Sequence, residues 1–262
     1  MTAPAAAPAI VRCGRVASTQ AVVFALAADG APDRTVVVAD SQSAGRGRRG
    51  RAWHDEPGAS LLVSILLRPQ LPVSRLPALS LTAGVAVAEA LMHAAGLPAR
   101  LKWPNDVLVN GRKLAGILLE ARFSGEIGRA GATSSSNSPP TFPPDHAPPA
   151  PTIALGIGVN VAQRAFPPEL AGRATSVRLA GGAVDREALL TGLLDALDRW
   201  RGRLEREGFA PVRERWRALA DTLGRTVTVE GVTGVAVDVD DDGALLLEVD
   251  GHRRRVVGGE LG

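Results

Sequence analysis

The segment LKWPNDVLVNGRKLAG, residues 101–116, gives the clearest indication of how this chain folds. Asn110-Gly111 is a preferred pair for a two-residue type I′ turn, and β-type runs flank it on both sides. The segment therefore predicts a β-hairpin over residues 106–122, preceded by a short strand at residues 100–103. The turn fixes Lys113 at the start of the returning strand.

The same segment contains both lysines of the chain, Lys102 and Lys113, while the other 28 basic residues are arginines. The lysine ammonium is a compact point charge on a flexible stem, whereas the arginine guanidinium is a planar fork. Compositional drift could leave two lysines at random positions. Their closeness in sequence favours a chemical role that arginine cannot fill for at least one of them.

Helices and strands are both expected on either side of the hairpin. Ser18 is a good N-cap for a helix that ends at Gly30, a residue type that commonly stops helices. Apolar and β-branched runs predict strands, and long apolar or amphipathic runs predict helices. The expected strands are residues 34–40, 59–69 and 152–161, and the further helices are residues 74–93, 185–207 and 210–222.

The last 40 or so residues change character, because strand-like runs there alternate with DDG and DG turns. This pattern predicts a small antiparallel β-barrel at residues 223–262, separate from a domain at residues 1–222.

Residues 124–151 form a Ser-, Pro- and Gly-rich stretch with almost no apolar content. Such a composition predicts a disordered insertion, dispensable for chemistry, between two strands that a short turn would otherwise join.

The densest chemical signal is GRGRRGR, residues 45–51. It formally contains GxGxxG, but a dinucleotide fingerprint opens a helix, and here a loop and then a strand follow. It also lacks the GK[ST] ending of a Walker loop. A glycine loop carrying four arginines suits a carboxylate together with a polyphosphate. The alternative is a solvated or nucleic-acid-binding RG stretch.

Two further groups of residues carry possible chemistry. Asn105 and Asp106 follow a strand, where they could hydrogen-bond a base or hold Mg²⁺, although Asp106 could equally cap a turn. In GIGVN, Gly156 and Gly158 would allow close approach to a strand backbone, and Asn160 offers an amide. Glycines within a strand can equally mark a bulge.

Composition limits the classes of protein to consider. The formal net charge is +3, which suits a local basic patch and an acidic partner rather than a nucleic-acid coat. The single Cys13 fits a reducing cytoplasm. The N-terminal segment lacks a secretory signal, and the longest apolar run contains Glu89 and reads as a buried helix rather than a membrane span. Neither GxSxG nor HExxH is present, and four scattered histidines suggest no metal cluster.

Together, STQ, QSAGRGRRGRAW, KWPNDV, NGRKLAGIL and GIGVN resemble the biotin protein ligase family in order and approximate spacing, from Ser18 to Asn160. The resemblance implies an α+β catalytic domain like those of biotin ligases and class II aminoacyl-tRNA synthetases. This domain has a mixed β-sheet with helices packed on it, and a small C-terminal Src-homology-3-like β-barrel follows. The chain leaves no room before Ser18 for the winged helix of repressor-type members. We therefore expect a ligase-only enzyme that binds no DNA.

The resemblance implies the reaction and its main residues. Such enzymes join biotin to ATP as biotinyl-5′-adenylate and then transfer biotin to one lysine of a carrier protein. Arg48 and Lys113 would neutralise the carboxylate and the α-phosphate, and Asp106 would contact Mg²⁺ or the incoming lysine. The family's contacts to biotin and nucleotide match Ser18, Thr19, Gln20, Gln42, Gly45, Arg46, Gly47, Arg49, Arg51, Trp53, Asn105, Gly116, Gly156, Gly158 and Asn160.

More specific roles are also implied. Hydrogen bonds to the ureido ring of biotin would come from Ser18, Thr19 and Gln42, while Gln20 replaces the usual asparagine but keeps the amide. The bicyclic ring would be admitted by Gly45, Gly116 and Gly158. Trp53 would form an apolar wall or simply pack in the core. Phosphate contacts or loop ordering would come from Arg46 and Arg51, and nucleotide contacts from Asn105 and Asn160.

The expected partner is the acidic biotin carboxyl carrier domain of a carboxylase. We expect no membrane association, a cytoplasmic location, and a monomer or weak homodimer. One alternative is a lipoate or octanoate transferase, which shares the fold class and a catalytic lysine but would not be expected to carry GRGRRGR. The other is a non-enzymatic nucleic-acid-binding module that uses the RG loop.

Overall fold

The computed structural model describes residues 8–123, 151–259 and 261. Its centre is a seven-stranded sheet with the order β1-β2-β3-β7-β6-β5-β4. β1 pairs with β2 in parallel, whereas the other neighbours are antiparallel, so the sheet is mixed as expected. The strands are β1 Ile10–Val16, β2 Val36–Gln42, β3 Ser60–Leu67, β4 Arg100–Lys102, β5 Asp106–Val109, β6 Arg112–Arg122 and β7 Thr152–Asn160.

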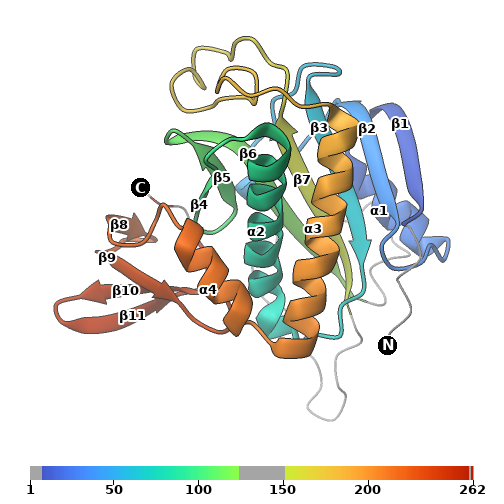
Figure 1. The fold of residues 1–262 in the computed structure, drawn as a ribbon. Helices are drawn as coiled ribbons and strands as arrows, with labels where there is room; N and C mark the ends of the chain where they lie inside the picture. Colours follow the sequence, from blue (N-terminus) through green and yellow to red (C-terminus); the bar gives the residue numbers. More distant parts are fainter. Residues whose placement is uncertain (1–7, 124–150, 260, 262) are drawn as a thin grey trace.

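Helices cover both faces of this sheet. The larger core lies under α2 (Leu76–Ala95), α3 (Arg186–Glu207) and α4 (Ala210–Leu219), and Figure 1 shows α2 and α3 crossing the sheet side by side. A smaller cluster packs α1 (Thr19–Ala28) against Val37, Leu66 and Ala154 on the opposite face. Successive strand residues point to opposite faces, which explains why Val36 and Val38 belong to the larger core and Val37 to the smaller one.

The hairpin predicted from Asn110-Gly111 is confirmed. Both turn residues have positive φ, 51° and 71°, as a type I′ turn requires. β6 then pairs with β7 from Ala115↔Val159 to Arg122↔Thr152, so the intervening insertion joins adjacent antiparallel strands. The insertion itself, residues 124–150, lies outside the described residues, and its predicted disorder stays a prediction.

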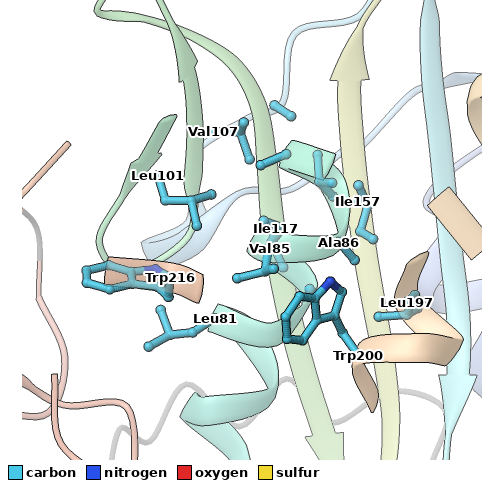
Figure 2. Close-up of a cluster of buried hydrophobic side chains, with 14 of the residues drawn as sticks. Leu81, Val85, Ala86, Leu101, Val107, Ile117, Ile157, Leu197, Trp200 and Trp216 are labelled. Carbon is cyan, nitrogen blue, oxygen red and sulfur yellow. The ribbon is translucent and has the colours of Figure 1, made fainter. Parts of the chain in front are cut away.

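α2 is the buried helix that the longest apolar run predicted. By length and composition alone, Val73–Ala95 would qualify as a membrane span. In the fold it is a core helix, because 13 of its residues are buried. Figure 2 shows Leu81, Val85 and Ala86 of α2 among core side chains from neighbouring strands and helices.

The sequence analysis missed β1, and it described the start of α1 only partly. β1 is an edge strand with mostly exposed or half-buried side chains, so it lacks the apolar run of a buried strand. Ser18 does occupy the N-cap position of α1, but its side chain makes no capping hydrogen bond. It is buried beside the cavity described below.

The C-terminal region forms a second, four-stranded antiparallel sheet with the order β11-β10-β9-β8. Its strands are β8 Thr226–Val229, β9 Val232–Val239, β10 Leu245–Val249 and β11 His252–Val256. Val227 and Val229 of this sheet belong to the same apolar cluster as α2 and α4, so the two sheets share one core. The boundary at residue 222 stays a prediction, four residues before β8 begins.

Candidate active site

An open cavity of about 790 Å³ lies on the face of the large sheet that α1 covers, next to the start of α1. Leu62 and Ser64 of β3, Gly156 and Gly158 of β7, and Leu118 of β6 form its floor. These alternate residues lie on the same face as Leu66 and Ala154, which pack against α1. The arginine loop, residues 160–174 and the C-terminal region complete the wall.

Lys113 and Asp106 form the charged centre of the cavity. The hairpin turn brings the two strands together, and the Lys113 Nζ lies 2.6 Å from the Asp106 Oδ1. The ammonium also lies 5.8 Å from the centre of the Trp53 ring. Both side chains of the ion pair are partly exposed, at 33% and 23%, so an incoming anion can reach the ammonium.

The arginine loop divides its four side chains between different tasks. Arg46, Arg48 and Arg51 line the cavity. Arg48 donates to the Asn105 Oδ1 at 3.3 Å, and Arg46 lies 3.3 Å from the Glu120 Oε1 on β6. The positive charge expected from this loop is therefore present in the cavity.

Arg49 departs from the predicted set of ligand-binding residues. It is absent from the cavity wall among the described residues, and its guanidinium pairs with Glu230 at 2.8 Å. Spacing along a loop does not show on which side each side chain emerges, so the ligand contact expected of Arg49 stays a prediction.

The groups assigned to the ureido ring are gathered at the start of α1. Gln42 accepts hydrogen bonds from the Thr19 backbone N–H at 2.8 Å and from its hydroxyl at 3.1 Å. The Thr19 hydroxyl also lies 2.7 Å from the Ser64 hydroxyl, a cavity residue that the sequence analysis missed. Ser18 lines the cavity beside them, so a polar cluster suited to a urea group is in place.

Gln20 binds the backbone of the sheet, unlike Ser18 and Thr19 beside it. Its Nε2 donates to the carbonyls of Leu118 and Ala154, each at 3.1 Å, so the amide nitrogen is engaged by the sheet backbone. A Cβ at Gly156 would lie 3.0 Å from the Gln20 carboxamide carbon. Gly156 therefore makes room for Gln20, and both remain on the cavity wall.

Three glycines expected to admit the ring of biotin make room for Trp53 in this structure. A Cβ at Gly158 would lie 2.7 Å from the indole, one at Gly116 3.0 Å, and one at Gly45 3.3 Å from the Trp53 Cβ. Gly45 is absent from the cavity wall among the described residues, so it shapes the loop instead. Trp53 lines the cavity and is only half-buried, which favours the wall role over simple core packing.

Asn105 and Asn160 both line the cavity, and the chain itself already binds part of each amide. Asn105 donates to the carbonyl of Ile117 at 2.8 Å, and Asn160 donates to that of Thr175 at 3.0 Å. Gly47 and Lys102 also lie on the wall.

Sequence reasoning missed two parts of the wall. Residues 166–174 follow β7 without helical or strand periodicity, and Arg173 accepts a hydrogen bond from the Lys113 backbone at 2.8 Å. The other part comes from the C-terminal region, including Arg225, Val227 and Gly259. Neither part has a local motif, because each is placed by tertiary packing.

No group of three or more His, Cys, Asp or Glu side chains suited to a metal ion occurs in the part of the chain that the structure describes. Asp106, Glu169 and Asp221 are carboxylates on the cavity wall. Mg²⁺ in nucleotide sites commonly takes only one or two carboxylates and otherwise binds substrate phosphates and water. The residues present fit that mode of binding.

The fold and the cavity define the class of biotin and lipoate protein ligases. Residues 13–131 match the biotin/lipoate A/B protein ligase family, and residues 222–261 match the biotin protein ligase C-terminal domain. The biotin–[acetyl-CoA-carboxylase] ligase of Paracoccus denitrificans is 38% identical over 258 residues, which cover 94% of this chain and 97% of that protein. The chain belongs to the biotin protein ligase family.

Other relatives agree with this assignment. The bifunctional ligase/repressor of Bacillus subtilis is 34% identical over 253 residues, covering 94% of this chain and 71% of that protein. The biotin protein ligase of Aquifex aeolicus in complex with biotin and ATP superposes with a TM-score of 0.78 at 28% identity, covering 97% of each chain.

Proposed function

We propose that this enzyme activates biotin with ATP and transfers it to a lysine of a biotin carboxyl carrier protein. In the first step a biotin carboxylate oxygen attacks the α-phosphorus, and pyrophosphate leaves. In the second step the ε-amino group of the carrier lysine attacks the acyl carbon of biotinyl-5′-adenylate. AMP leaves, the amine loses a proton, and an amide bond forms.

The observation that carries this proposal is the ammonium of Lys113 in a cavity that arginines also line. The first step brings two anions together, so fixed positive charge is needed where negative charge develops. Lys113 would lie between the biotin carboxylate and the α-phosphate, exchanging part of its contact with Asp106 for the substrates. Arg48, which also lines the cavity, would hold the phosphates, and the polar cluster of Thr19, Gln42 and Ser64 would bind the ureido ring.

Asp106 would contribute to both steps. Mg²⁺ bound to the ATP phosphates would shield their charge, and Asp106 is the carboxylate best placed to meet it. In the second step, the same carboxylate would orient the ε-amino group of the carrier lysine. Both roles are supported by its contact with Lys113 at 2.6 Å.

The carrier should present an acidic surface. Arg46 and Arg51 line the cavity, and the chain as a whole has a net charge of +3, so complementary charge would speed the encounter. A monomer or weak homodimer in the cytoplasm, where the free thiol of Cys13 would persist, completes the proposal.

A substrate-activation assay separates this function from lipoate or octanoate transfer. We expect pyrophosphate release from ATP when biotin is added, and a rate at least about 100-fold lower with lipoate, because hydrogen-bonding sites reject analogues that leave their polar groups unpaired. Equal or faster release with lipoate would establish the alternative. Salt-sensitive nucleic-acid binding without pyrophosphate release would instead support the RG-loop module.

A further inference from the structure

Arg49 is the arginine of the loop for which the cavity gives no role. It adopts a left-handed backbone conformation, with φ of 55°, and directly follows Arg48, which lines the cavity. Its NH2 group donates to the Glu230 Oε1 at 2.8 Å. Glu230 lies 181 residues further along the chain, in the C-terminal region. The ion pair therefore connects the arginine loop to the second sheet.

Glu230 is carried on a well-fixed turn. Glu230 and Gly231 have φ of 49° and 83° and form the tight turn between β8 and β9. A Cβ at Gly259 would lie 2.5 Å from Val229 and 3.0 Å from the Glu230 side chain, so the C-terminal tail packs closely against the turn. Val227 and Gly259 themselves line the cavity. Glu230 thus lies in a tightly packed turn next to residues that line the cavity.

Other contacts hold the loop that Arg49 belongs to from within and from the side of the large sheet. The Gly47 N–H donates to the Arg51 carbonyl at 2.6 Å and closes the loop on itself. On the side of the large sheet, Arg46 pairs with Glu120 and Arg48 with Asn105, both at 3.3 Å or more. The contact of Arg49 with Glu230, at 2.8 Å, is shorter than both of these and is made with the C-terminal sheet instead of the large sheet. Because Arg48 and Arg49 are consecutive, fixing one restricts the other.

We propose that Glu230 is a positioning residue for adenylation: its ion pair with Arg49 holds the arginine loop closed, so that Arg48 faces the substrates. The effect on activity rests on the function proposed above, whereas the effect on the loop does not. The C-terminal sheet thereby contributes to the first step of the reaction without placing Glu230 on the substrate.

The size of the effect follows from exposure. The two side chains are 54% and 56% exposed, so the pair favours the closed loop by only about two- to fivefold. Substrates close the loop in either case, so losing the pair raises the KM for ATP by at most that factor and leaves kcat unchanged. Salt screens such a pair, so the difference should vanish near 1 M NaCl.

The test compares Glu230→Gln with Glu187→Gln. Glu187 pairs with Arg12 at the same exposures, 54% and 56%, but joins β1 to α3 away from the cavity wall. We expect Glu230→Gln to raise the KM for ATP and to speed tryptic cleavage within residues 46–51 at low salt, and the two factors should multiply to about two- to fivefold. Glu187→Gln should change neither. Identical behaviour of the two variants would overturn the proposal.

A charge exchange provides rescue. Arg49→Glu alone should raise the KM for ATP. Adding Glu230→Arg should bring the KM most of the way back to the wild-type value, because the pair is re-formed with its charges reversed. A KM that stayed raised in the double variant would contradict a direct pairing.

If the wild type released no pyrophosphate with biotin, the proposed function would be wrong. The cleavage comparison of the Glu230 and Glu187 variants, which needs no substrate, would still decide whether the pair holds the loop.

Discussion

At the scale of single residues, Lys113 shows why an arginine cannot replace a lysine at this position. Its Nζ is held 2.6 Å from Asp106 and 5.8 Å from the centre of the Trp53 ring. A Cβ at Gly116 would lie 3.1–3.2 Å from the end of the lysine chain, so the backbone already approaches it closely. This space fits a compact ammonium, and a planar guanidinium would have to displace the indole or the carboxylate.

We therefore expect Lys113→Arg to reduce biotin-dependent pyrophosphate release by about 10²–10³-fold, the usual cost of losing one group that stabilises charge in the transition state. Biotin binding should weaken, while the thermal midpoint should stay within about 2 °C, because the side chain is partly exposed. Pyrophosphate release, biotin titration and thermal unfolding measure the three effects. Lys102→Arg is the comparison, with a smaller expected loss. Wild-type turnover by Lys113→Arg would rule out the bridging role.

The sequence could predict which residues gather at the site better than what each side chain does there. Lys113 and Asp106 meet in the cavity because the hairpin pairs β5 with β6, and the loop between β2 and β3 brings Arg48 to the same cavity. Arg49 and Gly45 were assigned to the same site, but the loop turns one toward Glu230 and packs the other against Trp53. Such directions depend on tertiary contacts that a motif does not encode.

At the scale of secondary-structure elements, one carboxylate joins three helices. Glu89 of α2 accepts hydrogen bonds from Arg199 and Trp200 of α3 and from Arg215 of α4, each at 2.8 Å. Burial alone would raise the pKa of Glu89. The hydrogen bonds from these three side chains and the charge of Arg215 outweigh burial, so the pKa lies below its usual value of 4.5.

Because its pKa is lower in the folded state, ionised Glu89 stabilises the fold at pH values above about 4.5. This contribution is lost as the pH falls through the folded-state pKa. Glu89→Gln should lower the free energy of unfolding by about 2 kcal/mol at pH 7, since hydrogen bonds to a charged group are weakened. The difference from wild type should shrink below pH 4.5. Urea unfolding at pH 7 and pH 3.5 measures both values.

Glu187→Gln is the control for this prediction, because Glu187 pairs with Arg12 in the open and should contribute less than about 1 kcal/mol. A pH-independent difference between wild type and Glu89→Gln would show that the charge of Glu89 is not the cause.

The elements themselves were largely predictable where local chemistry determines them. The Asn110-Gly111 turn and the apolar runs of β3 and α2 gave correct elements with ends within a few residues. β1 was not predictable in this way, because an edge strand has no doubly buried apolar run. The irregular stretch between β7 and α3 lacks any period, yet it supplies part of the cavity wall.

At the scale of the whole molecule, the two sheets are joined by more than the chain. The Trp103 indole donates to the carbonyl of Gly243 at 3.0 Å, and the Trp103 N–H donates to the hydroxyl of Thr222 at 2.9 Å. Gly243 lies in a turn of the second sheet that meets the start of α2, where an added Cβ would lie 2.9 Å from the Ala78 nitrogen. Because one apolar cluster also spans both sheets, the molecule should unfold as one cooperative unit.

Gly243 and Gly251 form a matched pair for testing the contact between the second sheet and the start of α2. Both are turn glycines of the second sheet with positive φ, 86° and 75°, but nothing lies within 4 Å of a Cβ at Gly251. Gly251→Ala should cost about 1–2 kcal/mol, from backbone strain alone. Gly243→Ala carries the same strain and also forces the turn away from α2, which adds about 1–3 kcal/mol. Tryptophan fluorescence during urea unfolding measures both, because all four tryptophans precede the second sheet. Equal losses in the two variants would mean that the large sheet and its helices do not depend on the docked C-terminal sheet for stability.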